Sequence, residues 1–554
     1  MTLPYEPAAH LASRMLREKV VSRIWNRDVS VWNASPGSID ARSISNRLGW
    51  LDVGSTMPPL LDQVETFATG CRQEGAEAAL LLGMGGSSLC AEVLRSVYGG
   101  KPGSADLLVL DTTDERTLTA AAAGIDPGRT LAIVASKSGG TVEVASMEQF
   151  FWDRLSAALG MGAGRQFVAI TDPGTPLQQL AAGRGYRATF VNPADIGGRF
   201  SALSLFGLIP AAWLGASARD LLAAGTVMAA GCRQENHANA GLELGAFIGA
   251  ATLAGRSKLT VLLPPSLQTL GLWIEQLVAE STGKHGKGAL PVVDEPLGSP
   301  DEYGDDRAFV AIASERDEPD RGALAALERA GHPVLRLSTR LEHIGAEFFR
   351  WEFATAVAGA ALGINPFDEP NVAEAKEKTK RLLAAYRDDG RLPETAPAAR
   401  GEGVAAHSPT FTGGTPAAVL RAAVDSLRPG DYVAFLSYLP ADSAVQEAVS
   451  RARLAIRGRT RAATTFGVGP RYLHSTGQYH KGGPNTALAV VLTADDASET
   501  PIPEAGYSFA VLKRAQALGD IQALEAHGRR VVRLHVTGED SAGALERTFA
   551  EALR

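Results

Sequence analysis

The sequence predicts an α/β fold, and three observations lead to this class. Short apolar runs typical of buried strands alternate with segments of helical periodicity, first from Glu77 onward and again from Lys258 onward. Such alternation indicates βαβ units, in which helices join parallel strands. The chain has 554 residues, which is more than one core usually holds. We therefore expect two α/β units in tandem, with further segments before and after them.

Composition and charge exclude several classes of protein. Apolar residues make up 45% and charged residues 21% of the chain, as in ordinary globular proteins, and the net charge of -7 argues against general nucleic-acid binding. No apolar stretch is long enough to cross a bilayer, and the first residues lack the basic and apolar regions of a signal peptide. The three cysteines form no CxxC pair, so we expect a reducing, cytoplasmic compartment.

The expected elements divide the chain into four parts. Residues 1–75 are predicted to form a helical arm whose tryptophans pack it against the rest of the protein. We expect this arm to carry no catalytic or binding residues. Residues 76–235 and 236–390 each hold one α/β unit, and residues 391–554 form a C-terminal α/β extension. The stretch 389–415 is rich in Gly, Pro and Ala, which predicts a linker or long loop.

The strands are expected where the apolar runs lie. In the first unit they fall at 78–82, 106–110, 130–135 and 166–170. In the second they fall at 258–263, 308–313 and 333–337, and in the extension at 431–437 and 486–492.

A glycine-rich loop, Gly83-Met-Gly-Gly-Ser-Ser88, follows the first strand directly and opens a helix. Glycines let a backbone turn tightly and approach an anion, and the N–H groups at a helix start bind it. A dinucleotide loop is the rival interpretation, but the adjacent glycines and following serines do not match the GxGxxG spacing. This loop alone is a weak signal.

A second loop, Ser136-Lys-Ser-Gly-Gly-Thr141, lies between another expected strand and helix. Hydroxyls and backbone N–H groups at a helix start suit a phosphomonoester, although Ser and Thr also favour that position as simple caps. Two such loops at the carboxyl ends of neighbouring strands make a small phosphate site the better interpretation.

The segment Ile196-Gly-Gly-Arg-Phe-Ser201 holds a cation between flexible glycines and a serine. Its glycines would let Arg199 approach a ligand and stabilise a developing oxyanion. A structural arginine on a turn is an equally good interpretation of this segment alone.

The stretch from Gln276 to Lys284 reads as the end of a helix whose apolar residues recur at helical spacing. Gln276 and Glu280 are four residues apart and share one face. A carboxylate at a helix end that faces a cleft is placed to act as a general base, whereas a lone solvated glutamate is the plainer alternative.

A fourth motif is Asn365-Pro-Phe-Asp-Glu-Pro370, followed by a helix that carries Lys376. A lysine on a helix is usually a solvated surface charge, and the residues alone assign it no further role.

Together and in this order, these motifs resemble the phosphoglucose isomerase family over roughly residues 77–380. The segments around Arg23 and around Tyr472–Gly483 resemble a narrower group, the isomerase half of bifunctional transaldolase/phosphoglucose isomerase proteins. No transaldolase barrel precedes that half in this sequence, so we expect no transaldolase activity.

The resemblance implies a fold, a reaction and partners. The fold would be two tandem SIS-type (sugar isomerase) units, flavodoxin-like doubly wound parallel sheets. The reaction would interconvert glucose 6-phosphate and fructose 6-phosphate through a cis-enediolate, in glycolysis and gluconeogenesis, with no cofactor and no metal. The partner would be the sugar phosphate, with no nucleic acid and no membrane, and the protein would be a homodimer.

The resemblance also implies roles for the matching residues. Glu280 would move the proton between C2 and C1, Arg199 would stabilise the enediolate, and Lys376 would help with ring opening and hydroxyl contacts. The expected substrate-binding residues, which hold the phosphate or lie near the sugar, are Gly86, Ser87, Ser136, Lys137, Ser138, Thr141, Gln276 and Glu369.

The sequence departs from the family at two positions. The family usually has Gln where Glu369 stands. The family's ring-opening histidine follows the catalytic glutamate by a few tens of residues, but Gly298–Asp306 contains no histidine. The extension offers His474 and His480 in a glycine-rich stretch, and a histidine suits proton transfer near pH 7. We expect His480 to be the ring-opening group, with surface residues on a turn as the alternative for both histidines.

Two other functions stay open at this point. SIS units also serve as sugar-phosphate-binding regulators without catalysis, but a regulator needs neither the base Glu280 nor the cation Arg199. An isomerase that also acts on mannose 6-phosphate is compatible with the same residues.

Overall fold

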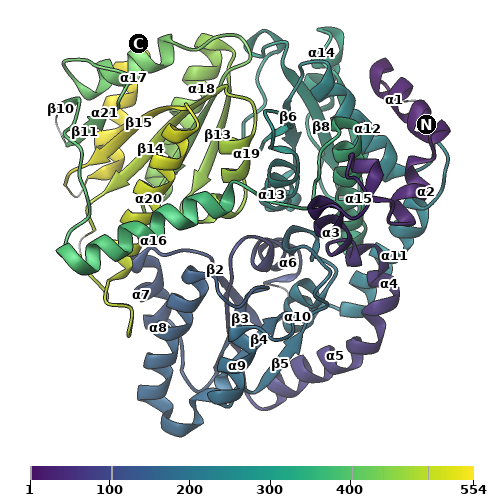
Figure 1. Ribbon diagram of the computed structural model, residues 1–554, viewed down its shortest axis with the longest axis vertical. Helices are drawn as coiled ribbons and strands as arrows, with labels where there is room; N and C mark the ends of the chain where they lie inside the picture. Colours follow the sequence, from purple (N-terminus) through teal and green to yellow (C-terminus); the bar gives the residue numbers. More distant parts are fainter. Residues whose placement is uncertain (1–2, 101–103, 402, 441, 497, 539) are drawn as a thin grey trace.

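The computed structural model describes residues 3–100, 104–401, 403–440, 442–496, 498–538 and 540–554. Three parallel-stranded sheets, each flanked by helices, are arranged around a common centre (Figure 1). This arrangement confirms the predicted α/β class with tandem doubly wound sheets. No helix within the described residues is long and apolar enough to cross a membrane.

The first sheet has five parallel strands in the order β2-β1-β3-β4-β5. Its strands are β1 (Ala78–Leu82), β2 (Asp106–Leu110), β3 (Thr130–Ala135), β4 (Phe167–Thr171) and β5 (Ala188–Val191). Its helices are α6 (Leu89–Tyr98), α7 (Glu115–Ala123), α8 (Val142–Leu159), α9 (Pro176–Gly183), α10 (Leu205–Trp213) and α11 (Ala218–Cys232). Every residue of β3 is buried because helices cover both faces, which explains its unbroken apolar sequence.

The second sheet has four parallel strands in the order β7-β6-β8-β9. Its strands are β6 (Lys258–Leu262), β7 (Leu290–Val292), β8 (Arg307–Ala313) and β9 (Val334–Ser338). Its helices are α12 (Ala240–Leu253), α13 (Leu270–Thr282), α14 (Arg321–Arg329), α15 (Ile344–Leu362) and α16 (Val372–Asp389). Helix α16 leaves the second unit and runs between the first unit and the extension (Figure 1).

The third sheet belongs to the extension and has six strands in the order β10-β11-β15-β14-β12-β13. Its strands are β10 (Ala399–Gly401), β11 (Val404–His407), β12 (Tyr432–Ser437), β13 (Ala463–Val468), β14 (Ala487–Ala494) and β15 (Arg530–Val536). Its helices are α17 (Pro416–Asp425), α18 (Ser443–Thr460), α19 (Gly477–Gly482), α20 (Phe509–Ala526) and α21 (Ser541–Leu553). The segment 389–415 is therefore not only a linker, because β10 and β11 form an antiparallel hairpin on the edge of the sheet.

The parallel parts of all three sheets share one topology. In each sheet, the first parallel strand in the sequence lies between the second and the third, and the fourth lies on the other side of the third. The extension therefore repeats the strand order of the two units before it. We propose the division at residues 75, 235 and 390 as the domain organisation, with one sheet in each of the three parts after the arm.

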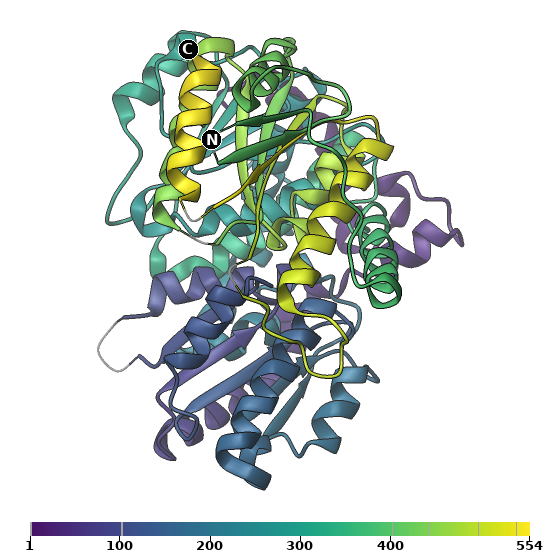
Figure 2. The same ribbon diagram turned by 90° about the vertical axis from the view of Figure 1, so that its left-hand side faces the viewer.

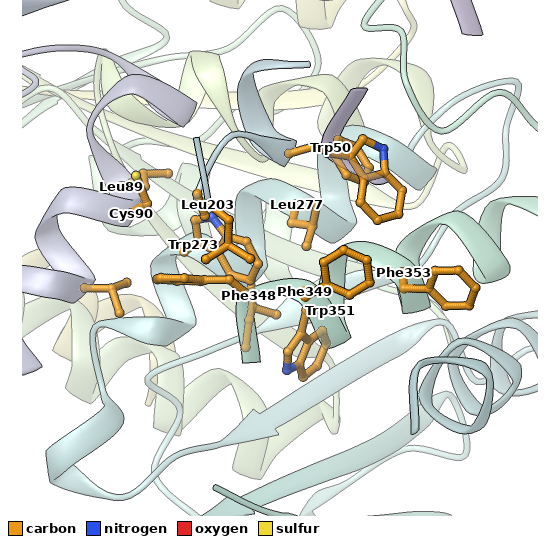
Figure 3. Packing of buried hydrophobic residues seen from close by; sticks show 14 of the residues in the cluster. Trp50, Leu89, Cys90, Leu203, Trp273, Leu277, Phe348, Phe349, Trp351 and Phe353 are labelled. Carbon is orange, nitrogen blue, oxygen red and sulfur yellow. The ribbon is translucent and has the colours of Figure 1, made fainter. Parts of the chain in front are cut away.

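The N-terminal arm consists of α1 (Glu6–Arg17), α2 (Val20–Trp25), α3 (Ile39–Ser45), α4 (Val53–Thr56) and α5 (Pro58–Gln73). Its Trp50 is fully buried and lies 5.3 Å from the ring of Phe200 and 5.5 Å from that of Phe349 (Figure 3). Trp32 packs edge-on against Phe367 at 4.9 Å. The arm thus supports Phe200, which follows Arg199 in the sequence, and Phe367, which belongs to the fourth motif.

Candidate active site

A cavity of about 270 Å³ lies where the carboxyl ends of the first sheet meet the end of α13. The fourth motif, the start of α16 and a segment of the extension close its remaining sides. It brings together ten of the twelve predicted site residues, namely Gly86, Ser87, Lys137, Ser138, Thr141, Arg199, Gln276, Glu280, Glu369 and Lys376. The other two, Ser136 and His480, do not line it.

The first glycine loop owes its shape to close backbone contacts. Gly85 has a φ of +55°, which favours glycine, and a Cβ atom at Gly86 would lie 2.1 Å from the carbonyl oxygen of Gly198. The first and third motifs therefore pack backbone against backbone. This contact sets Ser87 and Arg199 on neighbouring walls of the cavity.

The second loop presents hydroxyl groups at the start of α8. Thr141 occupies the N-cap position, but its side chain makes no capping hydrogen bond, so its hydroxyl is not committed to the helix. Ser136 lies behind it, where its hydroxyl donates to Thr141 Oγ1 at 3.4 Å. The Lys137 ammonium is bound by the Asp172 carboxylate and the Ala194 carbonyl, so it is turned away from a ligand at this loop.

Arg199 is buried and ties three parts of the site together. Its Nε donates to Ser281 Oγ at 2.8 Å, and its Nη2 donates to the carbonyls of Pro366 and Asp368 at 2.9 and 2.8 Å. Its Nη1 lies 3.2 Å from Glu280 Oε1 and 3.0 Å from Glu369 Oε2. One guanidinium thus faces two carboxylates across the cavity.

The two carboxylates respond to this cation in opposite directions. Glu280 is buried on the last turn of α13, and burial raises its pKa above the ordinary value despite the opposing charge of Arg199. Burial would raise the pKa of Glu369 too, but the charge and hydrogen bond of Arg199 outweigh it and lower that pKa. Of the two carboxyls, Glu280 therefore has the higher proton affinity, as a group that takes up and returns a proton requires.

Gln276 connects Glu280 to the extension. Its amide nitrogen lies 3.2 Å from Glu280 Oε2 and donates to the carbonyl of His474 at 2.8 Å. The shared helix face predicted for Gln276 and Glu280 therefore exists, and the extension packs directly on it.

The expectation that His480 reaches the site is wrong. His480 lies in the short helix α19, which packs on the end of α13, and it is almost fully buried. Its Nδ1 lies 2.8 Å from the hydroxyl of Tyr432 in the core of the extension. Burial, together with the charges of Lys481 and Arg529, lowers its pKa to about 3, so it is a neutral core residue.

His474, six residues earlier, lines the cavity instead. Its Nε2 lies 2.9 Å from Oε1 of Glu143, a buried residue in the first turn of α8. Burial would raise the pKa of Glu143, but the charge and hydrogen bond of His474 outweigh it and lower that pKa, so Glu143 is an acceptor for His474. His474 Nδ1 has no hydrogen-bond partner in the described part of the chain.

The extension fixes His474 from two sides. Arg471, in the same short helical turn, forms a paired ion bridge to Asp111 of the first unit, with both N–O distances at 2.8 Å. Gln516 of α20 donates to Glu143 Oε1 at 2.7 Å and accepts from Thr113 at 2.9 Å, which sets the orientation of its amide. The histidine is thus held by residues of both units.

Arg47 also lines the cavity and was missed by the sequence analysis, which expected no chemistry in the arm. Its guanidinium has no ion pair within the described residues. Its side chain lies 3.4 Å from the position of a Cβ atom at Gly197. No motif marks it, because a side chain that reaches the cavity from a separate segment needs no special backbone geometry.

Lys284 ends the stretch that begins at Gln276 and does not line the cavity. It is fully buried, and its ammonium donates to the Asp368 carbonyl at 2.6 Å and to the carboxylate at 2.5 Å. Burial lowers its pKa to about 8. This pair holds the fourth motif against α13, so Lys284 positions Glu369 and Arg199.

No group of His, Cys, Asp and Glu side chains that could hold a metal ion occurs in the described segments. Hydroxyls, backbone groups, cations and two carboxylates line the cavity. Such a set can bind a phosphate at one end and exchange a proton at the other.

Comparisons with known proteins agree with this geometry. A sequence model of the family described as phosphoglucose isomerase matches residues 53–299. The glucose-6-phosphate isomerase of Rubrobacter xylanophilus is 31% identical over 364 residues, covering 56% of this chain and 83% of that protein. That of Parabacteroides distasonis is 30% identical over 400 residues, covering 61% and 87%.

Two solved structures share the fold. A hypothetical protein from Thermus thermophilus matches with a TM-score of 0.58 and 24% identity, over 67% of this chain and 96% of that one. A glucose-6-phosphate isomerase from Chlamydia trachomatis matches with a TM-score of 0.56 and 18% identity, over 68% and 86%. With 83% of the Rubrobacter protein covered at 31% identity, the chain belongs to the phosphoglucose isomerase family of enzymes.

Proposed function

We propose that this protein interconverts glucose 6-phosphate and fructose 6-phosphate by proton transfer through Glu280. The observation that carries the proposal is a buried carboxyl of raised pKa, held beside a buried arginine in a cavity lined by two hydroxyl-bearing loops. The names of the similar proteins from Rubrobacter and Parabacteroides support the same reaction.

The phosphate binds at the glycine and serine loops. The hydroxyls of Ser87, Ser138 and Thr141 and the N–H groups at the start of α8 are neutral donors that suit a phosphomonoester. Arg47 adds a full positive charge from the arm, on the same cavity. The sugar then extends toward Glu280.

The proton moves between C2 and C1 of the sugar. Glu280 removes the proton from C2 of the open-chain aldose, and the electrons of that C–H bond form the enediolate with negative charge on O1. The proton of the O2 hydroxyl is transferred to O1, and Glu280 then returns its proton to C1 as the C2 carbonyl forms, which gives the ketose. Arg199 faces the developing charge, and a fixed cation in a buried site stabilises it.

Ring opening precedes this step for the cyclic substrate. A proton must reach the ring oxygen as another leaves the C1 hydroxyl, and His474 is our candidate for this exchange. Its bond to the Glu143 carboxylate orients the ring. Lys376 lines the same cavity and supplies hydroxyl contacts.

The two alternatives predict different behaviour. A sugar-phosphate-binding regulator would need the loops but not the Glu280–Arg199 pair, so the presence of that pair favours catalysis. Action on mannose 6-phosphate as well would follow from looser contacts around C2. The further expectations of a cytoplasmic homodimer that acts in glycolysis and gluconeogenesis belong to this proposal.

The test couples fructose 6-phosphate conversion to glucose 6-phosphate oxidation and compares the wild-type protein with Glu280→Gln. We expect activity in the wild type and a loss of about 10²–10⁴-fold in the variant, because a general base contributes an effect of this size. Binding of the sugar phosphate should persist in Glu280→Gln. An inactive wild-type protein that still binds the sugar would favour the regulator.

A further inference from the structure

A second cavity, also of about 270 Å³, adjoins the first on the far side of His474 and Lys376. It lies between the start of α8, one face of α16 and α20, and it includes Tyr507. It shares only four lining residues with the first cavity, so most of its wall belongs to no part of the proposed catalytic site.

The second cavity is strongly cationic. Lys376, Lys380 and Arg387 lie on one face of α16 and all line it. Within the described residues neither lysine has a carboxylate partner. Arg387 donates only to the Ala505 carbonyl, at 3.1 and 2.9 Å, so its charge is not neutralised either. From Lys376 to Arg387 the helix rises about 16 Å, so the positive charge extends along the cavity.

Its floor contains a buried acceptor with no donor. Glu143 lines this cavity and not the first, and its Oε1 accepts from Gln516 and lies next to His474. Its Oε2 is buried and has no hydrogen-bond partner. A buried oxygen left without a donor is costly, and a ligand hydroxyl would satisfy it.

Much of the remaining wall is apolar, beside the hydroxyl of Thr379 and the amide of Gln516. Val142, Leu383 and Leu473 surround the space, and the ring of Tyr507 carries the Arg387 guanidinium at 5.2 Å from its centroid. The volume is enough for a small metabolite. These cations, the one acceptor and the apolar walls are complementary to a particular kind of ligand. That ligand is a short carbon chain with an anionic group at each end and a hydroxyl between them.

We propose that the second cavity binds a small phosphorylated hydroxy acid at the same time as the sugar phosphate occupies the first cavity. The phosphate and carboxylate lie along Lys380 and Arg387, and the hydroxyl donates to Glu143. Because Glu143 also holds His474, occupancy alters turnover of the cyclic sugar; this consequence rests on the proposed function, whereas the binding itself does not.

The test is calorimetric titration of the full chain with 3-phosphoglycerate, which has both anions and a hydroxyl. It is done with and without a saturating equilibrium mixture of glucose 6-phosphate and fructose 6-phosphate. The decisive variant is Lys380→Glu, because that ammonium has no partner to disrupt within the described residues. The matched control is Arg381→Glu, which makes the same charge change one residue away, at an exposed side chain paired with Glu377.

We expect one 3-phosphoglycerate to bind the wild-type chain under both conditions. Lys380→Glu should weaken binding by about tenfold or more, the effect of losing one charge-assisted hydrogen bond, and Arg381→Glu should leave it unchanged. The proposal is overturned by absence of binding at millimolar probe, by complete displacement by the sugar phosphates, or by equal losses in both variants. A protein that binds the probe in this pattern yet lacks isomerase activity would refute the proposed function alone.

Discussion

The central region, residues 77–380, and the two flanking segments contribute to the active site in different ways. The central region carries every motif and most of the cavity wall, including Glu280 and Arg199. The arm and the extension carry none of these motifs, yet each sends one side chain into the cavity, Arg47 and His474. The extension lies at the upper left and the arm at the right in Figure 1, and the extension faces the viewer in Figure 2.

This difference shows which parts of an active site can be recognised from a sequence motif. A loop that must bring its backbone against a ligand or another loop requires glycine, as Gly86 does against Gly198, and this requirement produces a readable pattern. A side chain that reaches a cavity from a separate segment requires only the right position. Arg47 and His474 are residues of this second kind.

The largest effect expected from the arm is the loss of substrate affinity in Arg47→Ala. Removing a cation without an ion pair from the cavity wall should raise KM for fructose 6-phosphate by about tenfold, since charge-assisted hydrogen bonds contribute about 1.5–3 kcal/mol. The effect should shrink at high ionic strength. Steady-state kinetics at two salt concentrations measure it.

Arg42→Ala is the matched control, because Arg42 lies in the same arm and, among the residues that the structure describes, its guanidinium bonds only to the Gly37 carbonyl. If both variants raise KM equally, or neither does, the arm makes no direct contact with the substrate. That result would contradict the role given to the arm in the comparison with the central region.

A smaller effect is expected from Glu369→Gln in the central region. Glu369 raises the pKa of Glu280 by its negative charge and draws Arg199 toward itself. The neutral amide should lower the pKa of Glu280. A general base must be ionised, so activity is lost as pH falls through its pKa. The acid limb of kcat/KM against pH should therefore move to lower pH, and an unchanged or raised limb would show that Glu280 is not the titrating group.

The sequence allowed the fold class and most of the cavity to be predicted. Gln276 and Glu280 were placed on one helix face by their spacing, and four of the five strands of the first sheet by their apolar runs, because these features follow from local periodicity; β5 was not predicted. The resemblance of the motifs supplied their roles. The family itself is confirmed by the comparisons, whereas the link to bifunctional proteins stays a prediction.

What could not be predicted depended on tertiary packing. His474 and His480 share one glycine-rich stretch, and nothing local distinguishes them. The Arg471–Asp111 bridge directs His474 toward the first unit, and the burial of α19 directs His480 into the core of the extension. The hairpin of β10 and β11 was hidden for a similar reason, since it is stabilised by pairing with β15, more than a hundred residues away.

The central claim is that the extension completes the active site through His474. The most direct measurement compares two rates in His474→Ala and His480→Ala: turnover of cyclic glucose 6-phosphate, and exchange of the C2 proton with solvent on open-chain substrate. For His474→Ala we predict that cyclic turnover falls by about 10²-fold, as for the loss of a general acid, while C2 exchange persists.

His480→Ala tests only the stability of the extension, so the correctly folded fraction of that variant should keep both rates. Wild-type turnover of the cyclic substrate in His474→Ala, or an equal loss of both rates, would contradict the account.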